Sequence, residues 1–166
     1  MNLIQNLTRA LCVLSCLWTL SAAAEVPPAN PRAIVVESVS KQNFAVTLKN
    51  LKEQLKADGW NIVAEINLGE NLAKRNVVIP GGMVILELTS GKNAIPLLKD
   101  ESTRYVSALM PCSVSIYGMS DGSVMISRMN AALMANMMEP NVANVMQQAA
   151  IKLDATIAGA LARTEP

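Results

Sequence analysis

The chain has 166 residues and a mass of 17.7 kDa, the size of one ordinary domain. Apolar residues make up 51% and charged residues 16%, which excludes a disordered chain and predicts a folded, soluble domain. Lys and Arg number 14 and Asp and Glu 13, so no excess charge favours nucleic acid as a partner. The sequence has no histidine, which excludes reactions and metal sites that depend on imidazole.

The first 24 residues have the pattern of a secretory signal peptide. Arg9 precedes an apolar run from Ala10 to Leu20, and small residues follow up to Ala24. The pattern predicts cleavage after Ala24 and a periplasmic or secreted protein. The apolar run is shorter than the roughly 20 residues that span a membrane, so we expect no stable membrane anchor after cleavage. Lipidation at Cys16 is the alternative, and the apolar stretch that continues after this cysteine disfavours it.

Cleavage would leave one cysteine. Cys12 and Cys16 belong to residues 1–24, and only Cys112 follows them. The mature chain therefore has no internal disulfide framework, and its core must provide its stability. Three prolines in residues 25–32 predict an extended leader, and residues 33–166 are expected to form one domain.

The first part of that domain alternates strands with helices. Residues 33–40 are rich in β-branched side chains and predict a strand. Apolar residues at Phe44, Leu48, Leu51 and Leu55 have helical spacing, and the predicted helix ends at Asp58-Gly59. A second strand is expected over 60–68, followed by a short helical or irregular stretch through residue 74.

The middle of the chain predicts a buried strand and a short helix. A turn at Pro80-Gly81-Gly82 precedes the almost continuously apolar residues 83–88, which are typical of a strand at the centre of a sheet. A short helix is expected over 93–98, with Pro96 accommodated in its first turn.

Residues 112–129 predict a β-hairpin. Ser120-Asp121-Gly122 suits a three-residue loop with Gly122 in the left-handed conformation, which places Met119 opposite Ser123. In this register the position numbers of paired residues sum to 242. Aliphatic and serine side chains then separate onto opposite faces, whereas a one-residue slip mixes them. The aliphatic face holds Val114, Ile116, Val124 and Ile126, and the serine face holds Ser113, Ser115, Ser123 and Ser127.

Two helices are expected to complete the chain. One covers residues 131–138 and ends before Pro140; a longer one begins near Asn141. The longer helix has an apolar stripe that should cover the sheet: Val142, Met146, Ala149, Leu153, Ile157 and Ala160. The order of elements predicts an α+β fold, a two-layer sandwich in which helices pack on one face of a mainly antiparallel sheet.

Several phrases in this order resemble the DUF302 domain family. They are LKEQLKADGW, NIVAEINL, MVILELTSG and MPCSVSIYGMSDGSVMISRMN, within residues 44–161. The resemblance implies an α+β sandwich and, because the family is a domain of unknown function, no reaction. The secreted members that this chain resembles carry Pro-Cys before the hairpin and an Asn-Met-rich phrase after it. Pro111-Cys112, Met129-Asn130 and Leu133-Met134 correspond to these phrases. Ala131-Ala132 stands where such members often have more Met, Asp or His.

Sulfur chemistry is the one site hypothesis that the residues support. Six of the ten methionines lie between Met125 and Met146, and thiolate and thioether donors favour Cu(I) or an axial position on haem iron. The hypothesis places a soft metal at Cys112, Met129 and Met134. The alternative is that methionines fill a core poor in aromatic residues. The hairpin register favours this alternative, because it places Cys112 and Met129 on opposite faces.

Other chemistry has little local support. The serines have no histidine as a base, and the acidic residues show neither a paired-carboxylate phrase nor calcium-loop spacing. We therefore expect a small, non-catalytic binding domain for a metal, haem or an apolar small molecule. A homodimer through a sheet face or edge is one expected form of it. The alternatives are an interaction module for another periplasmic protein, with a purely structural Cys112, and, less favoured, a thiol redox enzyme without a resolving cysteine.

Overall fold

Five strands form one antiparallel sheet in the order β1-β5-β4-β3-β2. This computed structural model describes residues 31–163. The strands are β1 (Val35–Ser40), β2 (Asn61–Ile66), β3 (Met83–Thr89), β4 (Cys112–Gly118) and β5 (Val124–Met129). The predicted signal peptide, residues 1–24, and leader residues 25–30 lie outside the described part of the chain.

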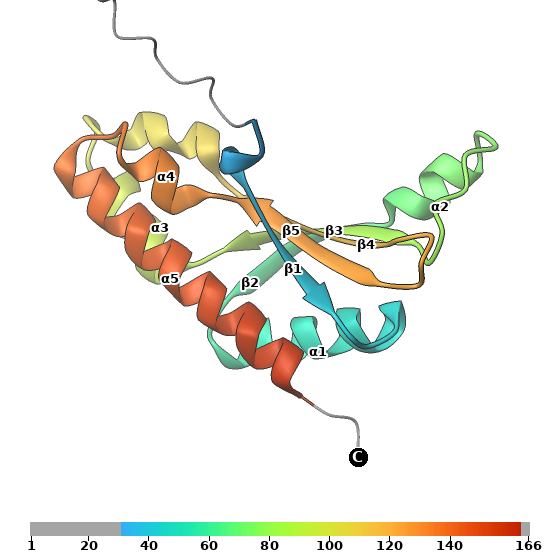
Figure 1. The fold of residues 1–166 in the computed structure, drawn as a ribbon. Helices are drawn as coiled ribbons and strands as arrows, with labels where there is room; N and C mark the ends of the chain where they lie inside the picture. The colour runs from blue at the N-terminus through green and yellow to red at the C-terminus, as the bar shows by residue number, and fades with distance from the viewer. Residues whose placement is uncertain (1–30, 164–166) are drawn as a thin grey trace, which may run out of the picture.

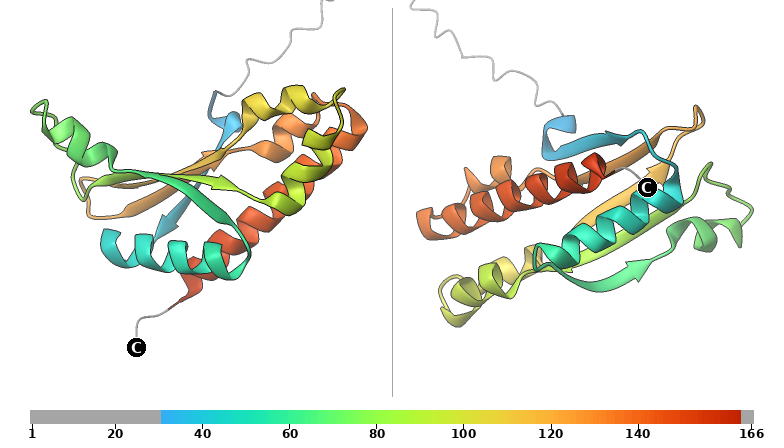
Figure 2. Two further views of the ribbon diagram at one scale, coloured as in Figure 1. Left: turned by 180° about the vertical axis from the view of Figure 1, so that it is seen from behind. Right: turned by 90° about the horizontal axis from the view of Figure 1, so that it is seen from below.

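Two long helices cover one face of this sheet. Helix α1 (Phe44–Ala57) and helix α5 (Pro140–Ala162) contact each other along that face (Figure 1). Two views of the ribbon show no helix over the middle of the opposite face among residues 31–163 (Figure 2). The structure therefore confirms the predicted α+β architecture, with helices on one side of an antiparallel sheet.

Shorter helices lie at the ends of the sheet. They are η1 (Pro31–Ile34), α2 (Leu68–Ala73), α3 (Gly91–Lys99), η2 (Arg104–Leu109) and α4 (Ala131–Ala135). Helix α2 projects from one end, whereas α3, η2 and α4 gather at the other (Figure 1). In the described residues, no helix has the length and hydropathy needed to cross a membrane.

The hairpin of β4 and β5 has the predicted register. Ile116 pairs with Ile126 and Ser115 with Ser127. The Met119 amide donates to the Ser123 carbonyl, and Gly122 has a φ of 86°. Burial alternates along both strands, with the aliphatic residues inside. The separation of aliphatic from polar side chains therefore selected one register, as the sequence predicts.

The main core lies between the sheet and the two long helices. It includes Leu51 and Leu55 from α1, Leu86 from β3, Ile116 from β4 and Ile157 from α5, each at most 1% exposed. A smaller cluster of Leu97, Val106 and Val142 packs under the short helices, and Met110, Met138 and Met146 contact it. These three methionines therefore contribute to the packing of the smaller cluster.

Several element boundaries differ from those expected. Strand β1 starts at Val35 because Pro31–Ile34 form a 3-10 turn, which a proline in the first turn permits. Helix α3 starts at Gly91, so Pro96 lies in its interior and the expectation of a first-turn proline was wrong. Helix α4 ends at Ala135. The sequence did not predict η2, because one buried residue, Val106, gives it no apolar periodicity.

Candidate functional site

Cys112 lies at the first position of β4, on the side of the sheet that faces the helices. It pairs with the buried Leu88 of β3 and shares the face of Val114. The cysteine is free and half-buried. Strand alternation therefore directs the thiol into the space under α5 and away from the open face of the sheet.

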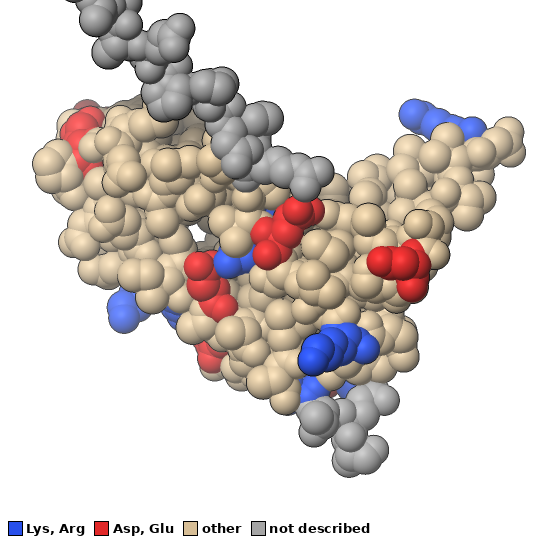
Figure 3. Space-filling model, viewed as in Figure 1, with Lys and Arg blue, Asp and Glu red and all other residues tan. Residues whose placement is uncertain are grey.

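Two small cavities meet beside Cys112. Their volumes are about 50 and 70 Å³, and Trp60, Cys112 and Ala149 line both of them. The first lies toward β1, β5 and the start of α4, whereas the second lies toward β3 and α3. Figure 3 shows a hollow beside α5, where acidic and basic side chains gather. The small side chain of Ala149 leaves room under α5 that a larger residue would fill.

Three residues that line the cavities each carry a buried nitrogen donor with no hydrogen-bond partner among the described residues. They are Trp60 Nε1, Asn93 Nδ2 and Arg128 Nη1. Arg128 lines the first cavity, Asn93 lines the second, and Trp60 lines both. Buried polar groups are normally paired, because an unpaired donor loses its hydration without compensation. Three such donors around two adjoining cavities mark this place as the candidate site.

Arg128 is held in position by Asp154 of α5. The guanidinium donates from Nε to Oδ1 at 2.7 Å, and Nη2 lies 2.5 Å from the same oxygen. The Arg128 side chain is 7% exposed and that of Asp154 is 54% exposed. The pair therefore neutralises the buried charge and fixes the guanidinium, while Nη1 has no hydrogen-bond partner among the described residues.

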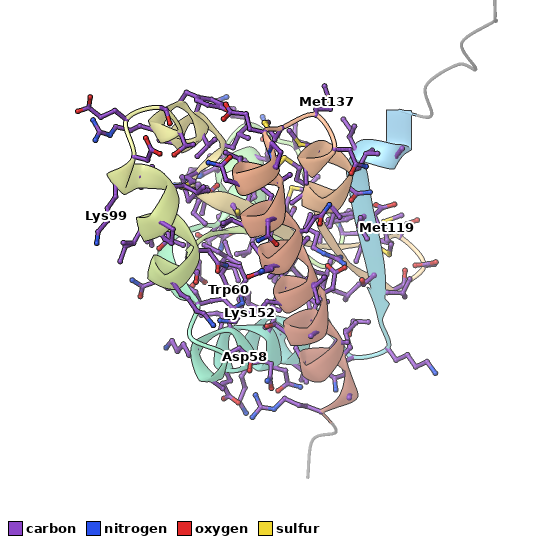
Figure 4. The ribbon with its side chains drawn as sticks, turned by 90° about the vertical axis from the view of Figure 1, so that its left-hand side faces the viewer. Asp58, Trp60, Lys99, Met119, Met137 and Lys152 are labelled. Atoms are coloured by element: carbon purple, nitrogen blue, oxygen red, sulfur yellow. The ribbon has the colours of Figure 1, made fainter. Side chains whose placement is uncertain are left out.

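Trp60 forms a wall between the site and a charged cluster at the end of α1. The Lys152 ammonium lies 5.5 Å from the centroid of the indole ring. Figure 4 shows Asp58, Trp60 and Lys152 close together beside α5. The Thr156 hydroxyl and the Gln54 amide hold the pKa of Asp58 below its ordinary value. The Lys152 cation thus lies over an indole ring that belongs to the lining of both cavities.

The environment of Cys112 keeps its thiol protonated. Burial raises the pKa of Cys112 above the ordinary value, and the carboxylate of Glu87 raises it further. Reactive cysteines need a lowered pKa and a positively charged surrounding. The geometry therefore argues against the thiol redox enzyme.

The structure brings Cys112 and Met129 to one cavity, and Met134 to neither. Met129 lines the first cavity, although it pairs with Val35 at the end of β5. Met134 is half-buried in α4 and lines neither of the two cavities beside Cys112. Two methionines outside the predicted set, Met110 and Met146, line the second cavity together with Cys112.

The sequence did not predict the three residues that carry the unpaired donors. Trp60 lies directly before β2, Asn93 in α3 and Arg128 in β5, and only the tertiary structure brings these three residues together. The signal that could have found Arg128 is a charged residue at an inward position of β5, after the apolar inward residues Val124 and Ile126. No group of three or more Cys, Asp or Glu side chains suited to a metal occurs within residues 31–163.

Comparisons with known proteins agree with this architecture. The family model described as "Domain of unknown function DUF302" matches residues 36–160. A solved structure titled "Crystal structure of uncharacterized conserved protein DUF302 from Bacillus stearothermophilus" is similar, with a TM-score of 0.68 and 20% sequence identity. The similarity covers 76% of this chain and 97% of that chain, and at this identity it supports the fold alone. A search of curated proteins found no match.

Proposed function

We propose that this chain, which belongs to the DUF302 family, is a small binding protein. The family is defined by a domain and not by an activity. The ligand of the protein occupies the two cavities beside Cys112, under α5. The observation that carries this proposal is the pair of adjoining, mainly apolar cavities that share Trp60, Cys112 and Ala149. Small-molecule sites in proteins are typically concave and mostly apolar, with a few polar residues in the lining.

The protein is proposed to act in the periplasm or outside the cell. This part of the proposal rests on the apolar run from Ala10 to Leu20 and the small residues that precede Glu25. The single cysteine after residue 24 is compatible with an oxidising compartment, because it leaves no second thiol for an internal disulfide.

The ligand can be detected on the exported protein itself. The full chain is produced in a host that exports it, and native mass spectrometry is applied without prior denaturation. We expect an adduct that Ala149→Leu abolishes, because leucine fills the space shared by both cavities. Ala158→Leu, an exposed position on the same helix, is the matched control and should retain the adduct. An adduct that survives Ala149→Leu would place the ligand elsewhere and overturn the proposal.

A soft metal is the second candidate occupant, favoured by the three sulfur-bearing residues around one cavity. Cys112, Met110 and Met146 line the second cavity, and thiolate with thioether donors selects Cu(I). Met129 and Met134, which the sequence proposes as ligands with Cys112, are tested beside them. Porphyrin is far larger than either cavity, so haem would need a different surface.

Titration with Cu(I) against a chelator of known affinity separates these sets. Cys112→Ser should abolish binding, and the methionine-to-leucine variants at positions 110, 146, 129 and 134 show which thioethers contribute. Met137→Leu is the control, since Met137 is 84% exposed. Unchanged Cu(I) affinity in Cys112→Ser would eliminate the metal candidate.

An interaction module is the remaining candidate, favoured by the open face of the sheet. Val35 and Val39 on β1 and Ile66 on β2 are exposed apolar residues on this face. The proposal commits to a homodimer, tested by light scattering during size-exclusion chromatography over a range of concentrations. Ser115→Arg, in the central strand, should yield monomers, whereas Ser120→Arg at the hairpin loop should not. A monomeric wild type at all concentrations would contradict it.

A further inference from the structure

An arm projects from the sheet between β2 and β3. It comprises residues 67–82 and includes α2. Two views of the ribbon show α2 rising on the side of the sheet opposite α1 and α5 (Figure 1, Figure 2). No residue of the arm is buried, and Val77 and Val78, which follow α2, are 46% and 79% exposed. The arm therefore has no core of its own and presents apolar side chains to solvent.

The end of the arm is basic. Lys74 and Arg75 follow α2 directly, and both are exposed. Figure 3 shows basic side chains at this end of the molecule. The ion pairs of residues 31–163 include neither Lys74 nor Arg75. The arm therefore carries two cations without a counter-ion in the described part of its own subunit.

The open face of the sheet has the opposite charge. Arg128 is the one Lys or Arg in the five strands, and its side chain points to the helix-covered side. Glu37 of β1 and Glu87 of β3 pair with strand residues of the serine face, so both lie on the open side. Their carboxylates accept hydrogen bonds from hydroxyl groups of β4, and neither has an ion-pair partner among the described residues. The open face therefore carries two carboxylates and no cation.

A homodimer through the open face needs cations from outside the strands. Packing two such faces together would gather the glutamates of both subunits in one interface, and like charges brought together there are costly. The two cations of the arm match the two carboxylates of the face in number and lie on the same side of the sheet. In a two-fold symmetric dimer, each subunit would give its arm to its partner and receive the partner's arm on its own face.

We propose that the arm clasps a second copy of this chain. Lys74 and Arg75 of each subunit form ion pairs with Glu37 and Glu87 of the partner subunit. A different, basic protein would neutralise the glutamates but would leave the cations of the arm unpaired, so the charges favour a second copy. This inference rests on the homodimer proposed above, because it assigns the element and the charges that hold that dimer together.

Charge reversal on either side tests the pairing. One double variant, Lys74→Glu with Arg75→Glu, makes the arm acidic, and another, Glu37→Lys with Glu87→Lys, makes the face basic. Each variant alone should dimerise about tenfold more weakly than the wild type in sedimentation equilibrium, because arm and face then carry the same charge. An equimolar mixture should form heterodimers, since opposite charges meet again at both contacts. Native mass spectrometry with one variant labelled with ¹⁵N distinguishes heterodimers from homodimers.

Two further variants serve as controls. Lys49→Glu with Lys56→Glu makes the same change in net charge at exposed positions of α1, on the other side of the sheet, and should dimerise as the wild type does. Glu37→Gln with Glu87→Gln removes the charges and keeps side-chain oxygen acceptors. It should weaken dimerisation as well, and it replaces the lysine variant if that variant fails to fold. Added salt should weaken the wild-type dimer, because it screens exposed ion pairs.

The outcomes separate the arm contact from the dimer. A wild-type dimer that tolerates both charge reversals would overturn the pairing and leave the homodimer intact. Equal weakening by the α1 control would show a general effect of net charge and would also overturn the pairing. A wild type that is monomeric at all concentrations would contradict the homodimer, and the arm contact with it.

Discussion

Arg128 is a charged residue with a buried side chain, so its surroundings must neutralise its charge. It occupies an inward position of β5, where its neighbours Val124 and Ile126 are aliphatic and buried. Its charge is tolerated because Asp154 reaches it from α5 and remains half in solvent. The pair joins the sheet to α5, the helix that covers the cavities. It therefore holds both the Arg128 guanidinium and α5 in position.

Removing the acid should cost more stability than removing the base. Asp154→Ala leaves a buried guanidinium without a counter-ion, and we expect the free energy of unfolding to fall by about 2 kcal/mol. Arg128→Met leaves an aspartate that water can solvate, so its cost should be smaller. Urea denaturation of both variants measures the difference.

An exposed pair gives the control for this comparison. Arg104 and Glu101 lie 3.6 Å apart at the surface, and Glu101→Ala should change stability by less than about 0.5 kcal/mol. A larger loss for Arg128→Met than for Asp154→Ala would contradict the role given to the buried charge.

Cys112 should titrate above the pH range of an ordinary thiol. Its buried position and the nearby Glu87 raise its pKa in the folded protein, whereas unfolding restores the ordinary value. The rate of alkylation by iodoacetamide should therefore rise at a higher pH in the folded protein than in urea. A midpoint at or below that of the unfolded chain would contradict the assignment.

The same shift predicts how stability depends on pH. Between the ordinary and the raised pKa, the folded state binds more protons than the unfolded state, so stability decreases as pH rises through this window. The contribution is fully present below the ordinary pKa of the thiol. Cys112→Ser should lack this decrease.

At the level of elements, the β4–β5 hairpin depends on two glycines for different reasons. Gly122 has a φ of 86° and open space around it, so only its backbone conformation requires glycine. At Gly118, a Cβ would lie 2.4 Å from the Pro80 carbonyl oxygen and 2.7 Å from the Gly81 Cα. The turn before β3 therefore packs directly on the end of β4.

Alanine at these two positions should have unequal effects. We expect Gly118→Ala to reduce stability by about 3 kcal/mol, because the neighbour is backbone that must move. Gly122→Ala should cost about 1 kcal/mol from conformational strain. Thermal unfolding monitored by circular dichroism gives the order, and equal costs would argue against the close approach at Gly118.

Sequence predicts those elements whose signals are local. The hairpin register follows from aliphatic and serine alternation on both sides of Ser120-Asp121-Gly122, and α5 follows from a long apolar stripe. The start of helix α3 is harder to predict. Pro96 suggests a helix that starts shortly before it, whereas α3 starts at Gly91. In η2 only Val106 is buried, so no pattern marks it.

The candidate site is non-local, and sequence captured part of it. Cys112 was proposed from its chemistry and lies at the cavities. Trp60, directly before β2, and Arg128 of β5 line the same cavity only in the folded protein, where α5 covers the sheet. Tertiary placement, not local spacing, therefore defines the site.

For the whole molecule, the N-terminal sequence predicts a processed chain. Exported protein should begin at Glu25, and intact mass measurement should show the loss of residues 1–24. Ala24→Phe should block cleavage, because a small residue is needed directly before the cleaved bond. Ala23→Phe, one position earlier, is the matched control and should be processed. Full-length mass in the exported wild type would contradict the prediction.

The two faces of the sheet have separate environments. The cavities, Cys112 and the unpaired donors lie on the helix-covered side, whereas the serine stripe, Val35 and Val39 lie on the open side. A partner on the open side would not block the cavities directly. Ligand binding and homodimer formation are therefore separable by the variants described above.

The order of the strands also governs when the sheet can be completed. Strand β1 comes first in the chain and pairs with β5, and Asn130 donates to the Ala33 carbonyl across 97 positions. During synthesis, β1 has no sheet partner until almost four-fifths of the polypeptide has left the ribosome. Contacts this distant in sequence slow folding. Under the proposed export, such a delay would give a translocation apparatus time to engage the nascent chain before its tertiary structure forms.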